Sequence, residues 1–497
     1  MSIDLKLPIL LKQTAIRANA LLIIKVIGLF GRVALSRMIG TEGVGLFQLV
    51  YAYYGFMLTL ITGGLPTTVA LETASNHEQG WLLFKKVSLV LISTSAILSL
   101  TTYTYSKEIS RLMGNEQLDF AIRCLAPALF TVPLLLLLKG FMQGLERYGA
   151  IAKVEVIEQM MRVGSMLLLV FLWLPAGHSF AVGGGILGTT ISAIIAFLIL
   201  TLIHRKPEQA PGSLTIQPLL TAALQASMAI ALTKIIIPAS DFIDAILIQQ
   251  RLQAAGFTPN SATEIYGIVA GMAVILVYMP TLVSSALSHT LTMKLVSDWQ
   301  EKRKTQFYRR VIQALELNWT WGWFSAVFLF GFSNELCWLF FGTTEPSLSV
   351  KYLAVVPLLV GSRELTTSVL WAQNRRSVPF WGLFCGISVG MVIIYFFIAV
   401  PGIEIAAITI SIVAMELIAS IWNLSALMAG RDRRQRIRIF HRSADILIAI
   451  CLCVLANQVS AVMNLSAPIN IISKITFYGS FAGIYFIMRF RSNLQHK

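Results

Sequence analysis

Charged residues are scarce in this sequence, and their scarcity excludes an ordinary soluble protein. Only 13% of the 497 residues are charged, whereas 56% are hydrophobic, and the mean hydropathy is +0.74. A soluble globular chain carries about 25% charged residues, and a chain of this length would divide into several domains with polar shells. A lipid bilayer removes the need for such shells, and helices satisfy their own backbone within it. The composition therefore predicts an all-α integral membrane protein.

Groups that carry enzyme chemistry or bind metals are also few. The five cysteines and six histidines are scattered along the chain. The sequence also shows no Ser-His-Asp pattern, no paired carboxylates and no phosphate-binding loop. Cys451 and Cys453 lie close in sequence, but no histidine or carboxylate completes a metal site there. We therefore expect no enzyme activity, no cofactor and no metal.

Apolar segments long enough to cross a bilayer recur along the whole chain. A helix needs about 20 apolar residues to span about 30 Å of hydrocarbon, and the sequence predicts about fourteen such spans. The first span is treated as retained, because no signal-peptidase pattern follows it. The expected spans are 9–36, 46–73, 82–106, 119–141, 152–174, 182–203, 217–248, 262–288, 308–331, 349–371, 378–400, 402–426, 444–464 and 470–490.

Basic residues are distributed unevenly between the two sides that these spans define. Most of the 39 lysines and arginines fall on the side of the amino terminus, and an excess of Lys and Arg marks cytoplasmic loops. We therefore expect both termini in the cytoplasm. The net charge of +15 favours contact with anionic membrane lipids, and the basic run at 431–442 fits that role better than nucleic-acid binding.

An internal repeat divides the chain. Arg37 precedes Pro66 by 29 residues, and Arg251 precedes Pro280 by the same interval. Duplicated helical halves are a usual transporter architecture, with the ligand path between them. We expect two six-span lobes related as a parallel repeat, with both prolines as kinks and candidate hinges. The expected domains are an N-lobe at 1–205, a C-lobe at 206–430, and a basic linker with two further spans at 431–497.

Three cations lie within the first span. Arg17, Lys25 and Arg32 fall within about 80° of one another at about 100° per residue, so they form one stripe that suits an anionic group. Ionisable residues inside a membrane are costly and commonly face a cavity or a partner. The alternative is that Arg17 and Arg32 extend to opposite interfaces and only Lys25 is buried.

The seventh span carries one cation and two acids on one face. Lys234, Asp241 and Asp244 lie within about 80° of one another, and Pro238 frees a backbone carbonyl between them. A broken helix with acids beside a cation suits an ion or proton site. An internal salt bridge is the alternative, and the sequence leaves both open.

Other charges in the spans need partners of their own. Glu158 and Arg162 are spaced to pair with each other, and Lys139 is expected to extend to the interface. Arg363 and Glu364 are adjacent and cannot share a helical face. The residues assigned to substrate binding are Arg17, Lys25, Arg32, Lys234 and Arg363, and those assigned to ion coupling or gating are Asp241, Asp244 and Glu364.

Short motifs of glycine, proline and charged residues are spread from about residue 10 to 425. They are Arg37-Met-Ile-Gly-Thr-Glu-Gly-Val-Gly-Leu-Phe-Gln48, Gly63-Gly-Leu-Pro66, Ala126-Pro-Ala-Leu-Phe130, Lys139-Gly-Phe-Met-Gln-Gly144, Glu158-Gln-Met-Met-Arg162, Arg251-Leu-Gln-Ala-Ala-Gly256, Ala262-Thr-Glu-Ile-Tyr-Gly267 and Gly271-Met-Ala273. In order and spacing they resemble polysaccharide transporters of the stage V sporulation protein B type, in which the first motif is the loop after the first span. Lys139 departs from the pattern, because the resemblance predicts Arg there, and Lys lacks the planar guanidinium.

The resemblance implies membership of the MOP exporter superfamily, which includes the lipid II flippase MurJ and the O-antigen flippase Wzx. It implies a cavity between two lobes, alternating access, and a glycan or peptidoglycan precursor on undecaprenyl pyrophosphate as substrate. The protein would act in cell-envelope synthesis, the spore cortex included, in the bacterial cytoplasmic membrane. Its expected partners are the lipid-linked glycan and anionic lipids, with a monomer working beside envelope-synthesis enzymes.

Three alternatives remain at this point. A cation-coupled drug exporter of the MATE type would require an acid-rich cavity, whereas the first span is basic. A membrane glycosyltransferase or polymerase would require a larger outer loop than those expected at 107–118, 249–261 and 332–348. A non-transporting scaffold would not require charges in mid-span.

Overall fold

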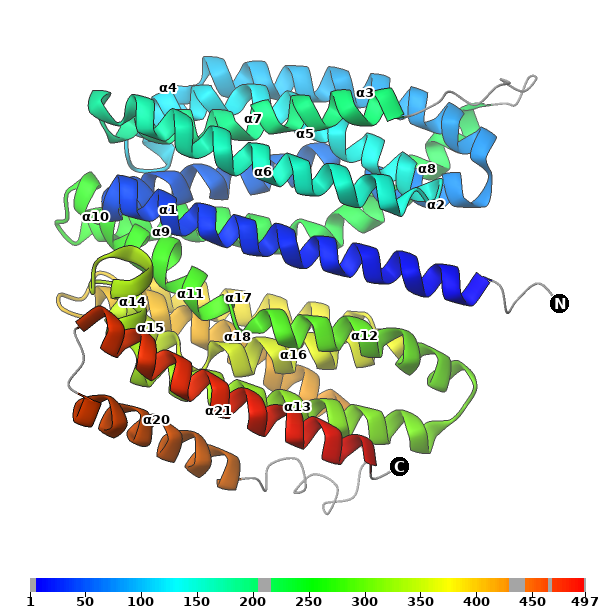
Figure 1. Cartoon of the computed structure of the whole chain (residues 1–497). Coiled ribbons are helices and arrows are strands. Elements are labelled where there is room, and N and C mark those ends of the chain that lie inside the picture. The colour runs from blue at the N-terminus through cyan, green and yellow to red at the C-terminus, as the bar shows by residue number, and fades with distance from the viewer. Residues whose placement is uncertain (1–5, 204–215, 429–442, 464–466, 496–497) are drawn as a thin grey trace. The chain divides into compact units, whose positions relative to one another are not determined.

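The protein is a helical bundle in the part of the chain that the structure describes. The computed structural model describes residues 6–203, 216–428, 443–463 and 467–495, which contain helices and no strand (Figure 1). Among these residues, 8 helices are long and apolar enough to cross a membrane, or up to 10 if each of two bent pairs counts as one span. The all-α membrane fold is confirmed, and the total of about fourteen spans stays a prediction.

The chain divides into two compact units. Unit 1 comprises Met1–Gln253 and Phe257–Gly267, and unit 2 comprises Ala254–Gly256 and Ile268–Lys497. These units are defined by contacts, whereas the expected lobes at 1–205 and 206–430 are defined by the repeat. The lobe boundaries therefore stay a prediction.

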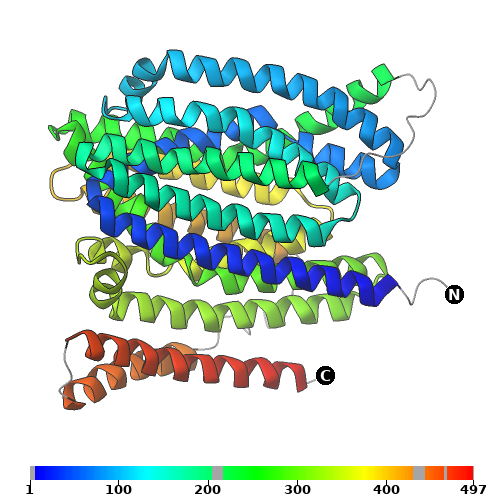
Figure 2. The same cartoon turned by 45° about the horizontal axis from the view of Figure 1, so that its top comes forward.

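Unit 1 packs its helices through small residues. A Cβ at Gly140 would lie 2.3 Å from the carbonyl oxygen of Pro66, and one at Gly188 would lie 2.7 Å from the backbone nitrogen of Met166. Helices in membranes associate by such close approach, because lipid supplies no hydrophobic drive between them. Helices α6 and α7 lie side by side in both views (Figures 1 and 2). The helices are α1 Lys6–Thr62, α2 Leu65–Ser75, α3 His77–Thr104, α4 Ser106–Leu112, α5 Leu118–Gly144, α6 Tyr148–Trp173, α7 His178–Ile203, α8 Ile216–Lys234, α9 Ile236–Ala254 and α10 Pro259–Tyr266.

The loop expected after the first span is absent. Element α1 comprises two helices that meet at a kink at Gly40, which leaves helical geometry with φ 65° and ψ −171°. Glycine adopts positive φ without the steric conflict of a Cβ. The prediction of a loop at residues 37–48 is therefore wrong, and the chain kinks at a single residue.

Unit 2 contains two helices that change direction sharply. Helix α14 is bent by 77° from α13, and α16 by 41° from α15. The expected outer loops at 107–118 and 332–348 contain the short helices α4 and α14, so their description as loops is wrong in part. The helices are α11 Val274–Tyr278, α12 Thr281–Gln300, α13 Lys304–Gly331, α14 Ser333–Phe341, α15 Ser347–Leu353, α16 Val356–Ala372, α17 Ser377–Phe397, α18 Glu404–Met428, α20 Ser443–Met463 and α21 Ala467–Gln495, with a π-helical turn at Gly267–Ala273.

The last two helices form an antiparallel pair within unit 2 (Figure 2). The buried carboxylate of Asp445 on α20 accepts hydrogen bonds from Thr320 on α13 and from Tyr485 on α21, at 2.7 Å each. A buried carboxylate is tolerated when donors satisfy it. These bonds fix the carboxy-terminal pair to α13.

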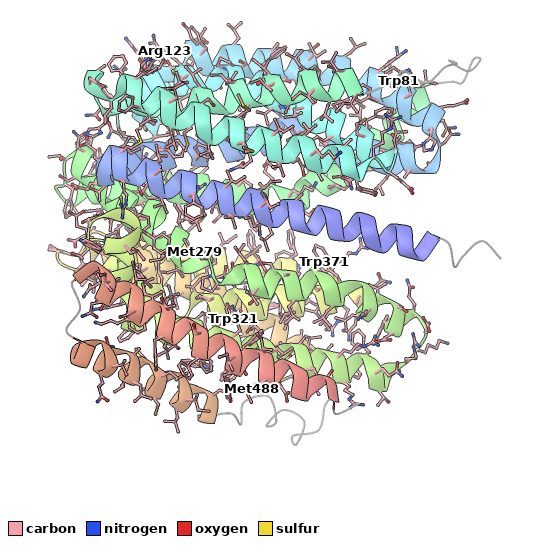
Figure 3. The ribbon with its side chains drawn as sticks, viewed as in Figure 1. Trp81, Arg123, Met279, Trp321, Trp371 and Met488 are labelled. Carbon is pink, nitrogen blue, oxygen red and sulfur yellow. The ribbon has the colours of Figure 1, made fainter. Side chains whose placement is uncertain are left out.

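The two ends of unit 1 carry different groups. Trp81 and Arg123 lie at opposite ends (Figure 3). Arg123 pairs with Asp119 at 2.9 Å, and the ammonium of Lys85 lies 5.0 Å from the centre of the Trp81 ring. The sequence predicts Arg123 and Lys85 on opposite sides of the membrane, and which of the two sides is cytoplasmic stays a prediction.

Candidate functional site

The cations of the first span lie on one helix, α1. Lys25 is exposed and Arg32 is half-buried, and neither side chain makes a hydrogen bond or an ion pair within the described part of the chain. The side chain of Arg17 lies outside the described residues. Between the two cations, Gly28 and Gly31 bring α1 against Gln159 and Val163 of α6. The helix thus holds two unpaired cations on the face beside its contact with α6.

Lys234 lies at the break between α1 and α2. Its ammonium donates a hydrogen bond of 2.9 Å to the hydroxyl of Thr67, the residue after the predicted hinge Pro66. A Cβ at Gly64 would lie 2.4 Å from the carbonyl oxygen of Ser227, so α8 packs against this break. The structure therefore brings Lys234 and Pro66 together, which sequence spacing did not predict.

The predicted helix break near Pro238 is confirmed. Helix α8 ends at Lys234 and α9 begins at Ile236, and no ion pair joins Lys234 to Asp241 or Asp244 in the described residues. Asp244 accepts a 3.5 Å hydrogen bond from Ser240, and its Oδ1 is buried with no donor. A buried carboxylate oxygen without a donor favours a bound proton or cation.

Aromatic residues pack against the helix α9, which carries the two aspartates. Phe242, between them in sequence, stacks on Phe56 with ring centres 5.2 Å apart and meets Tyr53 edge-on at 5.6 Å. The buried Tyr266 of α10 interacts electrostatically with both carboxylates. This apolar wall raises the cost of an uncompensated charge beside α9.

Arg363 of unit 2 makes a two-point ion pair. Its Nε donates to Oε2 of Glu416 at 2.6 Å, and its Nη2 donates to Oε1 at 3.2 Å. Sequence reasoning did not identify Glu416. It is the single acid in the apolar segment 405–428, and this isolation is a signal by which it could have been found. The neighbouring Glu364 accepts a 2.6 Å hydrogen bond from Ser285 of α12. Each residue thus has its own partner, as their adjacency predicted.

A buried ionic network joins α5 and α6 in unit 1. Lys139 lies 2.6 Å from Glu158 and 3.6 Å from Glu155, and Arg162 also pairs with Glu158. The Glu158–Arg162 pair is confirmed. The expectation that Lys139 extends to the interface is wrong, because two acids one helical turn apart on α6 hold its ammonium. A lysine is sufficient here, since it donates to single carboxylate oxygens.

Polar contacts also join α1, the α4–α5 connection and α10. Asn115 donates to Thr263 at 2.8 Å, Thr41 donates to Glu264 at 2.8 Å, and Gln253 donates to the carbonyl of Gly114 at 2.7 Å. A Cβ at Gly45 would lie only 2.0 Å from the carbonyl of Thr263. We call these contacts the end cluster. It was missed in the sequence because its partners are far apart along the chain.

The two candidate hinges both stand where a helix restarts. Pro66 is the second residue of α2, after Gly63 with φ 50°. Pro280 precedes the first residue of α12 and follows the short helix α11. Proline suits the first turn of a helix because it lacks a backbone N–H. Both prolines therefore lie at helix starts, and the repeat and a hinge role stay predictions.

Known proteins resemble this chain in sequence. Stage V sporulation protein B of Bacillus subtilis (strain 168) is 24% identical over 421 residues, which cover 81% of this chain and 80% of that protein. Lipid II flippase MurJ of the same organism is 26% identical over 214 residues, covering 40% and 39% of the two chains. The resemblance indicated by the motifs is confirmed.

Solved structures share the fold. A lipid II flippase MurJ in an inward closed conformation matches with a TM-score of 0.67 at 14% identity, over 95% of this chain and 98% of that chain. An inward-facing multidrug resistance transporter of the MATE family, MOP superfamily, matches with a TM-score of 0.65 at 14% identity, over 82% and 96%. The profile of the family described as Polysaccharide biosynthesis protein matches residues 10–291. Since that match covers more than half of the sequence, the chain belongs to the Polysaccharide biosynthesis protein family.

Proposed function

We propose that this protein is a flippase for a glycan or peptidoglycan precursor carried on undecaprenyl pyrophosphate, acting in the bacterial cytoplasmic membrane. Family membership over residues 10–291 carries the proposal. The fold shared with lipid II flippase MurJ supports it. Flipping a lipid breaks no covalent bond, so this function requires no catalytic residue and no cofactor.

The charges of unit 1 suit such a substrate. Lys25 and Arg32 on α1 have no side-chain partner in the described parts of the chain, and a pyrophosphate accepts strong, charge-assisted hydrogen bonds from cations. Arg17 extends the same stripe in the sequence, and Lys234 adds a cation at the α1–α2 break. Asp244, with its unsatisfied carboxylate oxygen, suits the coupling proton or cation. We propose that Asp241 and Glu364 take part in ion coupling or gating. Glu416 already holds Arg363, whose assignment to substrate binding stays a prediction.

Reconstitution tests the function directly. In proteoliposomes containing the full chain, a fluorescent undecaprenyl-pyrophosphate oligosaccharide should become accessible on the opposite leaflet faster than in empty vesicles. Tetraphenylphosphonium, a lipophilic cation typical of drug-exporter cargo, should leak at the rate of empty vesicles. Cation export without glycan flipping would reject the proposal in favour of a MATE-type exporter.

The proposed orientation places both termini and the loop near residue 302 in the cytoplasm. A Lys302→Cys variant in a cysteine-free background should therefore resist a membrane-impermeant maleimide in intact cells and react after permeabilisation. A second cysteine at 434 tests the basic run, which lies outside the described residues. Labelling of either position from outside would contradict the topology.

The end cluster is proposed to open during transport. Its contacts join Thr41 and Asn115 of the first repeat to Thr263 and Glu264 of the second, so an exit at this end requires that they separate. A variant with cysteines at Asn115 and Thr263, in a background without the five native cysteines, should lose transport when cross-linked and regain it on reduction. Measurement of flipping before and after dithiothreitol checks this.

A matched cross-link provides the control. The hydroxyl of Ser106 donates a hydrogen bond to the side-chain carboxylate of Asp119, and both residues belong to the first repeat. Cysteines at these two positions should cross-link without loss of transport. Unchanged transport with residues 115 and 263 joined would show that the end cluster does not open.

A further inference from the structure

Unit 2 contains an apolar groove that none of the assigned site residues lines. It has a volume of about 570 Å³ and lies among residues of α13, α15 and α20. Two of its lining residues, Phe330 and Val454, are 60% and 49% exposed. Since these helices belong to a membrane protein, the solvent at such an opening is hydrocarbon. An apolar groove of this size is not filled by water. A lipid chain would supply the van der Waals contacts that the lining side chains otherwise lack.

One charged residue lines this groove. Lys351 is half-buried, and its side chain makes no hydrogen bond or ion pair within the described residues. The other charges near the groove, Lys474 and Glu335, are 3.2 Å apart and neutralise each other. Among the residues that the structure describes, the groove therefore has a net positive charge carried by the ammonium of Lys351.

The position of Lys351 suits an ammonium at the depth of lipid head groups. Lys351 and Tyr352 stand near the end of α15, beside the point where α14 bends by 77° from α13. A helix that turns across the direction of a span marks the membrane surface, and Lys and Tyr are favoured at that level. A lipid whose chain fills the groove would place its phosphate near Lys351.

We propose that this groove binds an anionic glycerophospholipid, with an acyl chain against α13 and α20 and the phosphate paired with Lys351. The charge selects the occupant, because a zwitterionic lipid returns a second positive charge to the same place. The site is separate from the proposed transport of lipid-linked glycan. The proposal of a lipid site does not depend on whether the chain is a flippase.

Trp323 provides a probe inside the groove. Its indole nitrogen is buried with no hydrogen-bond partner, so Trp323→Phe removes no bond. The full chain is placed in phosphatidylcholine nanodiscs that contain increasing fractions of phosphatidylglycerol brominated on its acyl chains. The fluorescence of the wild type minus that of Trp323→Phe reports quenching at the groove. A parallel series uses brominated phosphatidylcholine.

Phosphatidylglycerol should quench Trp323 at about a fivefold lower mole fraction than phosphatidylcholine, as expected for one lysine beside an anionic head group. Lys351→Gln should abolish this preference, and Lys351→Arg should keep it. Lys107→Gln, which removes an exposed lysine of α4 in unit 1, should also keep it. Equal quenching by both lipids, a preference that survives Lys351→Gln, or displacement by an equal fraction of undecaprenyl phosphate would overturn the assignment.

Discussion

Replacing Glu416 by Gln is expected to lower the free energy of unfolding by about 3–5 kcal/mol, because it leaves a guanidinium without its counter-charge. The side chain of Glu416 is 2% exposed and that of Arg363 is 19% exposed. The carboxylate accepts two hydrogen bonds from Arg363 and a weaker one of 3.4 Å from Tyr278. Denaturant titration of the purified protein in detergent micelles measures the loss.

Two controls separate the lost pair from a general effect of substitution. Replacing both partners, as in Arg363→Met with Glu416→Leu, should recover most of the stability, because no buried charge is then left unpaired. Glu116→Gln removes an ion pair whose side chains are 65% and 76% exposed, and it should cost less than about 1 kcal/mol. A loss at Glu416 no larger than the loss at Glu116 would contradict the buried-pair argument.

The double variant also tests the role predicted for Arg363. If Arg363 binds the substrate, a stable double variant loses transport. Because Glu416 already occupies the Nε and Nη2 of Arg363, we expect that transport survives. Flipping by the double variant in proteoliposomes therefore distinguishes substrate binding from pairing between α16 and α18.

Local features of the fold could be predicted from the sequence. The apolar segments predict the positions of most of the helices, because the length of a span depends only on residues that are neighbours in the sequence. The Glu158–Arg162 pair and the break before Pro238 follow from helix geometry over a single turn. The local prediction was nevertheless wrong near Gly40, because a kink at this one residue with positive φ replaces the expected loop.

The tertiary contacts of the site could not be predicted in this way. Glu416 lies 53 positions from Arg363, and Thr263 lies 148 positions from Asn115. Hydropathy and helical periodicity specify which face a residue occupies, but not which helix meets that face. The ion pairs of Lys139 were not predicted for the same reason, because the acids that bind its ammonium lie on the next helix.

Replacing Lys25 by Ala should reduce flipping about tenfold or more while leaving the protein folded, since a charge-assisted hydrogen bond is worth about 1.5–3 kcal/mol. Lys25 lies far from either end of its helical segment. The 15 residues from Lys25 to Gly40 extend for about 22 Å, beyond the reach of a lysine side chain to that end. Its ammonium is exposed and has no partner in the described residues.

An unpaired ammonium at this depth costs at least about 2.5 kcal/mol in hydrocarbon, so water or an anion must compensate it. Arg32 lies within about 20° of Lys25 on the same helix face, which extends the positive potential along the path of a pyrophosphate. Lys25→Arg should keep most of the activity because it keeps the charge. Lys86→Ala, which removes an exposed lysine near the expected cytoplasmic end of α3, should leave flipping unchanged. The midpoint of thermal unfolding reports whether the Lys25→Ala variant is folded. If this variant keeps the wild-type midpoint and flips substrate at the wild-type rate, the α1 cations do not hold the head group.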